Sequence, residues 1–184
     1  MKHLFTTLLP LTLLAASLTA APAAAQQKCK GVYEEADPFT RHTVRNCQQA
    51  IGPLLGGWTF ILRQEGPKYM IGVGMNNGQH TTDKLPKGSR ISIMLGTDTP
   101  VEIVTAKDYE SVPLQIGDQQ YTRWVVCEYV AKETFTKFAA APITALKTSF
   151  KFKGNQQDFL LPGIKEKQGI RIRETAACML ETSR

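Results

Sequence analysis

Hydrophobic and polar positions alternate along much of the chain, which is the pattern of β-strands with one buried face. Three pairs of such stretches flank short runs of turn residues, and the stretches are 28–35 with 40–49, 58–62 with 69–75, and 91–95 with 101–103. Strands that are joined by a short turn pair in the antiparallel sense. The pattern therefore predicts three hairpins, or six strands joined locally into an antiparallel sheet.

A seventh strand is predicted at 121–130, where apolar residues occupy both faces. One face carries Arg123, Val125, Cys127 and Tyr129, and the other carries Trp124, Val126, Glu128 and Val130. Apolar residues on both faces are typical of a central strand that is covered on two sides. Elsewhere, Gly72 and Gly74 share one strand face and leave a flat strip, on which the ring of Trp58 or Trp124 is expected to lie.

The last third of the chain changes from period two to helical spacing. A short amphipathic helix is predicted at 132–141, ended by Pro142, and is followed by a strand at 143–153 with a bulge or bend. A second helix is predicted at 164–182, with a short strand at 170–173 as the rival interpretation. The apolar positions expected on one side of this helix are Gly169, Ile172, Ala176, Met179 and Leu180.

Together these elements predict the α+β class: a largely antiparallel β-sheet of hairpins, of about seven or eight strands, with two helices in the C-terminal third. The alternative is a β-sandwich with peripheral helices.

The first 25 residues have the composition of a signal peptide. Lys2 precedes an apolar run that passes into small residues and ends in Ala23-Ala24-Ala25, an A-x-A cleavage pattern. We expect cleavage before Gln26, export to the periplasm or the medium, and a single globular domain at 26–184. No second apolar run of about 18 residues follows, so no membrane span is expected after cleavage.

The excess of positive charge is concentrated in the last third of the chain. Residues 26–131 include eleven basic and eleven acidic residues, whereas residues 132–184 include ten basic and five acidic residues. This asymmetry suggests an anion-facing surface, with these candidates: Lys165, Lys167, Arg171 and Arg173. A solvated helix is the alternative interpretation. A nucleic-acid ligand is disfavoured, since no aromatic residues lie among these cations.

Four cysteines in an exported chain indicate disulfides, and all four (Cys29, Cys47, Cys127 and Cys178) are candidates for them. If the first hairpin turns at 37–40, Cys29 and Cys47 lie nearly opposite each other, which predicts a bond between them. Cys127 and Cys178 remain, either as a second bond that ties the last helix to the sheet or as two buried thiols.

The residues offer no recognisable catalytic constellation. Cys127 has no base or cation near it in sequence to hold a thiolate, no C-x-x-C pair occurs, and His42 and His80 show no zinc-ligand spacing. We therefore predict no catalytic residues, no metal and no cofactor, although a carboxylate-based site is set by space and is not readable from sequence.

Three functions remain as hypotheses. The first is an exported, non-catalytic domain that binds a partner protein, a glycan or an anionic envelope component. The second is a carrier of a small apolar ligand, with a pocket formed by Phe135, Phe138, Phe150 and Phe152, for which core packing is the alternative role. The third is a hydrolase or thiol enzyme.

Overall fold

The computed structural model describes residues 29–52, 57–77, 84–96, 100–152, 155–161 and 163–181, so the predicted signal peptide lies outside the described residues. The elements, in chain order, are β1 (Tyr33–Ala36), β2 (Thr43–Ile51), β3 (Trp58–Glu65), β4 (Lys68–Asn77), β5 (Arg90–Leu95), β6 (Val101–Val104), β7 (Ser111–Ile116), β8 (Gln119–Val130), α1 (Lys132–Ala140), β9 (Ile143–Phe152), β10 (Asn155–Leu161) and α2 (Glu166–Glu181). The predicted α+β class is confirmed.

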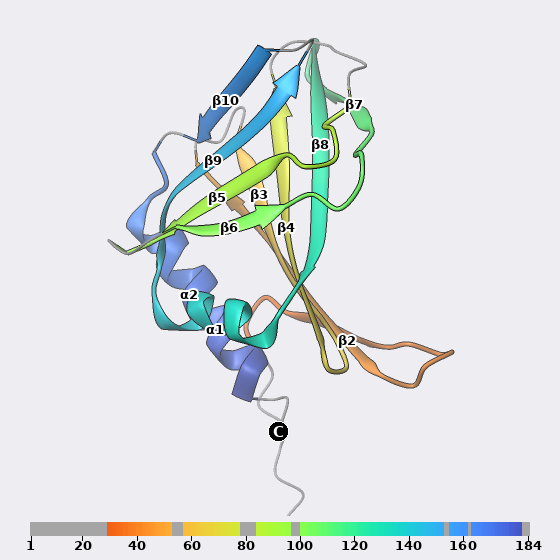
Figure 1. Cartoon of the computed structure of the whole chain (residues 1–184). Coiled ribbons are helices and arrows are strands. Elements are labelled where there is room, and N and C mark those ends of the chain that lie inside the picture. Colours follow the sequence, from red (N-terminus) through yellow and green to blue (C-terminus); the bar gives the residue numbers. More distant parts are fainter. Residues whose placement is uncertain are drawn as a thin grey trace, which may run out of the picture.

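The strands form two sheets. One sheet has six strands in the order β1-β2-β3-β4-β8-β7, and the other has four in the order β10-β9-β5-β6. Every pair of neighbouring strands is antiparallel. The four-stranded sheet lies in front of the upper half of the six-stranded sheet, and the two helices lie below it, beside the lower half (Figure 1).

One hydrophobic core fills the space between these layers. From β4, Tyr69 packs against Phe135 of α1, with ring centroids 4.8 Å apart. From β8, Trp124 packs against Phe150 of β9 at 6.2 Å. The inner face of the six-stranded sheet is thus shared, with α1 covering one half and the second sheet covering the other.

Both predicted helices are present. α1 buries Phe135 and Phe138 completely. α2 runs through 170–173, where the rival interpretation had a strand, and it buries Gly169, Ile172, Thr175, Ala176 and Met179. Within the described residues, no helix is both long and apolar enough to cross a membrane.

Two strands, β7 and β10, were not anticipated from the sequence. β7 contains Pro113, which weakens a strand pattern but is tolerated here because β7 is an edge strand. β10 begins with four exposed polar residues and shows no inward alternation until Phe159. These segments are strands because they pair with β8 and β9, and not because apolar residues alternate within them.

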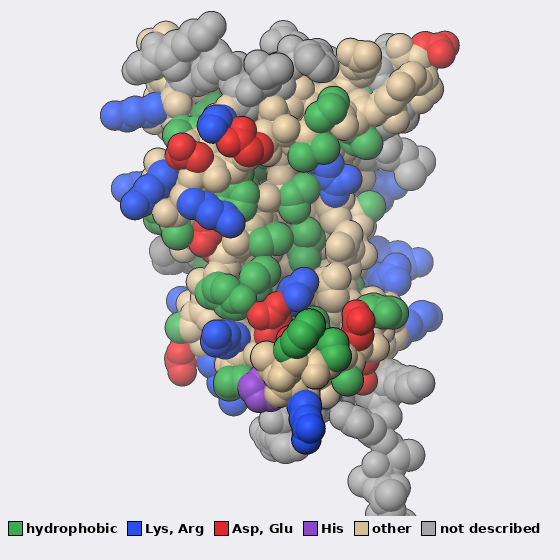
Figure 2. All heavy atoms as spheres, turned by 90° about the vertical axis from the view of Figure 1, so that its right-hand side faces the viewer, with side chains coloured by type: hydrophobic (Ala, Val, Ile, Leu, Met, Phe, Trp, Pro, Cys, Tyr) green, Lys and Arg blue, Asp and Glu red, His purple; other side chains and the backbone are tan. Residues whose placement is uncertain are grey.

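The prediction that β8 is covered on both faces is wrong. Trp124 and Val126 are buried on the inner face, whereas Val125 and Tyr129 on the outer face are 37% and 57% exposed. The outer face of the six-stranded sheet carries no second layer of described elements. Hydrophobic side chains form a band down the side of the molecule shown in Figure 2, with basic and acidic side chains interspersed along it.

The predicted stacking of a tryptophan on the glycine strip is also wrong, because Trp58 and Trp124 both point into the core. The sulfur of Cys127 lies over Gly72 instead, where it is 2.6 Å from the position a Cβ would take. The guanidinium of Arg123 lies over Gly74 in the same way and donates a hydrogen bond to Thr59 Oγ1 at 3.0 Å.

The predicted disulfide pairing is corrected by the structure: Cys29 is bonded to Cys178, and Cys47 and Cys127 are free thiols. The first hairpin exists, but its register pairs Tyr33 with Asn46, and β1 begins only at Tyr33. Cys29 therefore lies before the strand, in a turn closed by a hydrogen bond from the Val32 N–H to the Cys29 oxygen at 3.1 Å. This turn brings Cys29 to α2.

The alternative bond between Cys127 and Cys178 is excluded by the layering. α2 packs against β2 and β9 on the inner side of the six-stranded sheet. Cys127 lies on the outer side, next to Gly72 and Ile61. The sheet itself separates the two sulfur atoms.

Candidate anion-binding site

Three of the four predicted anion-facing residues line one surface hollow between α2 and β2. We call it the helix hollow; its volume is about 330 Å³, and its lining residues are Gly31, Cys47, Gln48, Gln49, Ala50, Lys165, Lys167, Gln168 and Arg171. The hollow joins segments that are more than 110 residues apart in the chain, so it exists only in the folded protein.

Gln168 fixes the start of α2 against the end of β2. Its side-chain oxygen accepts hydrogen bonds from the backbone N–H groups of Lys165, at 3.0 Å, and of Gly52, at 3.2 Å. The first of these is half of a capping box, in which the third helical residue reaches back to the residue before the helix. The backbone oxygen of Gln168 accepts a hydrogen bond from Gln49 Nε2 at 3.0 Å.

Two glycines bring the walls of the helix hollow close together. A Cβ on Gly169 would overlap the backbone oxygen of Ile143, so only glycine lets α2 approach β9 this closely. Gly31 has a φ of +78°, and the position of its absent Cβ is 3.3 Å from Arg171 Nη2. The bond between Cys29 and Cys178 ties the turn that carries Gly31 to α2.

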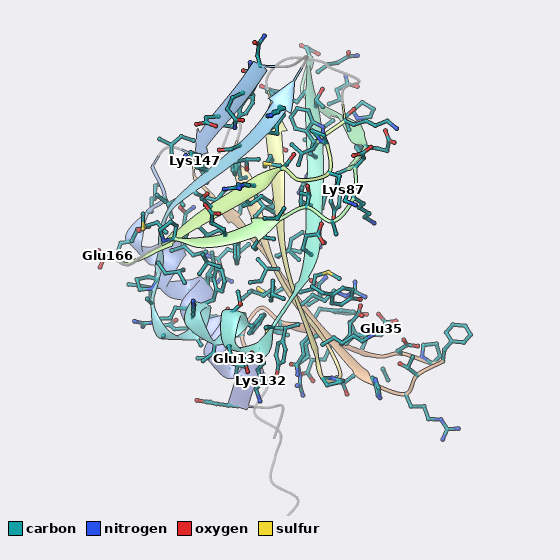
Figure 3. The ribbon with its side chains drawn as sticks, viewed as in Figure 1. Glu35, Lys87, Lys132, Glu133, Lys147 and Glu166 are labelled. Carbon is teal, nitrogen blue, oxygen red and sulfur yellow. A yellow bond between two sulfur atoms is a disulfide. The ribbon has the colours of Figure 1, made fainter. Side chains whose placement is uncertain are left out.

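The charge in the helix hollow has one sign. Lys165, Lys167 and Arg171 are exposed, and no carboxylate is among the described residues that line it. The side chain of Glu166 points outward from the start of α2 (Figure 3). The hollow also lies beside the N-terminus of a 16-residue helix, where the helix dipole adds partial positive charge.

Arg173 is not part of the helix hollow, although the sequence groups it with the other three cations. Its guanidinium is 3.9 Å from the carboxylate of the neighbouring Glu174, and its side chain is 38% exposed. Two residues along a helix correspond to a rotation of about 200°, which separates Arg173 from Arg171.

Cys47 is buried and forms the floor of the helix hollow. Burial raises the pKa of its thiol, while a hydrogen bond with Thr175 and the charge of Arg171 act in the opposite direction. The thiol is therefore protonated at neutral pH, which does not favour a nucleophilic role here. Beside it, Gln49 is 9% exposed, and its side-chain oxygen has no hydrogen-bond partner among the described residues.

A second and larger hollow lies on the outer face of the four-stranded sheet. We call it the sheet hollow; its volume is about 620 Å³, and its lining residues are Pro86, Lys87, Gly88, Ser89, Arg90, Ser92, Glu102, Lys147, Ser149, Phe150, Lys151, Gln156 and Asp158. Lys147 on β9 and Lys87, just before β5, are labelled in Figure 3. Unlike the helix hollow, it mixes cations with carboxylates.

The predicted apolar pocket does not assemble as one cavity. Phe135 and Phe138 pack into the core under α1, against Tyr69 and Phe60 respectively. Phe150 contacts the rings of Trp124 and Phe159 in the other half of the molecule. Phe152 lies in β9, but its side chain is outside the described part of the structure.

Sequence reasoning missed the polar wall of the helix hollow and the whole sheet hollow. Buried and exposed residues alternate in β2, and Cys47 and Gln49 share the buried face. This alternation is the sequence signal by which the two residues could have been found. Among the described residues, no group of three or more histidine, cysteine, aspartate or glutamate side chains is arranged to hold a metal ion.

Comparison of the chain with models of protein families, with curated proteins and with solved structures finds no match.

Proposed function

We propose that this protein is an exported, non-catalytic binding domain that holds an anionic group of its ligand, a carboxylate or a phosphate, in the helix hollow. The observation that carries the proposal is the convergence of Lys165, Lys167 and Arg171 on one concave surface without a lining carboxylate. Cations that only keep a helix soluble point separately into the solvent. These three instead border a shared volume of about 330 Å³.

The surroundings support anion binding. The start of α2 contributes the positive end of the helix dipole, and backbone N–H groups at a helix start are suited to anions. Gln168 and the disulfide hold the two walls in place before any ligand arrives, which lowers the entropic cost of binding. The disulfide and the N-terminal sequence pattern both support export.

Inorganic phosphate, titrated into isotope-labelled protein and followed by NMR, tests the proposal. We expect chemical-shift changes at the start of α2 and in β2, with an affinity that falls as salt is added, because the charges are exposed. The triple variant Lys165→Gln, Lys167→Gln and Arg171→Gln should lose these changes.

Arg173→Gln is the matched control for the single variant Arg171→Gln, because each removes one positive charge from the same helix but only Arg171 lines the helix hollow. Arg173→Gln should bind phosphate within about twofold of the unmodified protein, because an exposed charge that does not touch the ligand is screened by salt. If Arg171→Gln and Arg173→Gln weaken binding equally, the positive charge acts only as a diffuse field and the proposed site is wrong.

A further inference from the structure

The outer face of the four-stranded sheet is organised differently from the helix hollow. Cross-strand neighbours bring opposite charges together: Arg90 lies 3.7 Å from Glu102, and Lys147 lies 3.8 Å from Asp158. All four side chains are 46% to 65% exposed. Such long, exposed pairs contribute little to stability, so each partner is free to exchange its contact for one with a ligand.

Hydroxyl and amide groups fill the positions between these charges. Ser92 Oγ is 3.5 Å from Glu102 Oε1, and Gln156 Nε2 donates to Asp158 Oδ1 at 3.2 Å. A hydrogen bond with Ser149 is the main cause that lowers the pKa of Asp158, so this carboxylate is ionised at neutral pH. The sheet hollow therefore presents oriented acceptors and donors side by side.

An apolar shelf continues the sheet hollow along the strands. A neighbouring hollow of about 310 Å³ is lined in part by Met94, Pro100, Ala145 and Leu160, and it shares Ser92, Glu102 and Lys147 with the sheet hollow. The side chain of Leu160 is 65% exposed. Along β5 and β9 the outer face thus passes from charged and hydroxyl groups to apolar ones.

We propose that this face, formed by the sheet hollow and its apolar shelf, binds an oligosaccharide. A sugar ring offers vicinal hydroxyl groups, which both donate and accept, and C–H faces, which pack on apolar side chains. The mixture of carboxylates, a lysine and the three lining serines matches the hydroxyl groups, and Leu160 with Met94 matches a ring face.

The same observations make this face less suited to a strongly anionic ligand than the helix hollow is. Glu102 and Asp158 lie within the sheet hollow, where they would repel phosphate or sulfate groups. Lys87, Arg90, Lys147 and Lys151 outnumber these two carboxylates, so a sugar that carries a single carboxylate also fits. The site is separate from the helix hollow, since the two share no lining residue.

The test is an array of neutral and uronic-acid oligosaccharides, probed with the full mature protein, followed by NMR titration with the best-binding sugar. We expect shift changes in β5, β9 and β10. Glu102→Gln and Asp158→Asn should each weaken binding by about tenfold, since each removes a charge-assisted acceptor. Leu160→Ser should weaken binding through the apolar shelf without altering the charges.

Glu133→Gln is the matched control for Glu102→Gln, because Glu133 is an exposed glutamate on α1, away from this sheet (Figure 3). It should leave sugar affinity unchanged, as should the triple variant of the helix hollow. No binding on the array overturns the proposal, and so does binding with shift changes outside β5, β9 and β10. Binding to vesicles of anionic phospholipid without binding to sugars also overturns it.

Discussion

The hydroxyl oxygen of Tyr109 lies 2.6 Å from the backbone oxygen of Cys127 and 3.4 Å from the Cys127 nitrogen. β7 pairs with β8 only as far as Trp124, so the edge of β8 beyond that residue has no neighbouring strand in the described part of the chain. The tyrosine hydroxyl takes the place of a strand there, because it contacts both polar groups of one backbone position. It also lies 3.0 Å from Glu128 Oε1.

Tyr109→Phe should therefore destabilise the fold by about 1–3 kcal/mol, because it leaves backbone groups of Cys127 without their partner while the ring still packs. Urea unfolding at neutral pH measures the change. Val112→Ala on the exposed side of β7 is the control and should change stability by less than about 0.5 kcal/mol. If Tyr109→Phe loses as little stability as Val112→Ala, then water replaces the tyrosine hydroxyl as the partner of the Cys127 backbone groups.

The same hydroxyl predicts a pH dependence of stability. Burial and the Glu128 carboxylate raise the pKa of Tyr109 to about 12. Because the folded pKa exceeds the unfolded value near 10, the contribution is fully present below about pH 10 and is lost as the pH rises toward 12. The difference in unfolding free energy between the unmodified protein and Tyr109→Phe should shrink over this range.

Gly72→Ala should strongly destabilise the six-stranded sheet. A Cβ there would lie 2.6 Å from Cys127 Sγ and 2.9 Å from the Val126 oxygen, and such crowding costs on the order of 1–3 kcal/mol. Cys127→Ala removes the sulfur, so the double variant should recover part of the loss. The backbone contact with Val126 should prevent full recovery. Purely additive effects in the double-mutant cycle would show that the sulfur is not the obstacle.

Peptide mapping of protein exported to an oxidising compartment should find one disulfide, between Cys29 and Cys178. Replacing both by serine should lower stability by about 2–5 kcal/mol, since the bond closes a loop with a sequence separation of 149. Cys47→Ser and Cys127→Ser should leave this bond intact. Recovery of a Cys29–Cys47 peptide would contradict the register of the first hairpin.

The two free thiols should react slowly and in a fixed order. Burial raises the pKa of both Cys47 and Cys127, so the thiolate fraction at neutral pH is below that of an unfolded cysteine. Cys127 is partly exposed and should be alkylated before Cys47, and both rates should rise as the pH is raised above 9. Rapid alkylation of Cys127 near neutral pH would instead favour the thiol-enzyme hypothesis.

Local sequence patterns predicted the hairpins and helices because those signals lie within a few residues. The turn at Glu65-Gly66-Pro67 and the helical spacing of Phe135 and Phe138 are of this kind. The disulfide was mispredicted because the hairpin register differs from a symmetric estimate and because the partner of Cys29 is 149 residues away. No local pattern encodes that distance.

For the candidate sites too, the sequence predicts what depends on local spacing and does not predict what depends on long-range pairing. Helical spacing groups Lys167 with Arg171 and places Arg173 on another side of the helix, but it does not tell which side of α2 faces β2. The sheet hollow depends on the pairing of β10 with β9 and of β9 with β5, and β10 gave no strand signal in the sequence. Its charges therefore looked unrelated along the chain.

The bond between Cys29 and Cys178 turns almost the entire described chain into a covalent ring. A protease that cuts once in any loop between these residues would produce a nicked molecule that still migrates as one species until it is reduced. The same bond holds Cys29 beside the last turns of α2, so the first and last described residues lie near each other at the C-terminal end of that helix.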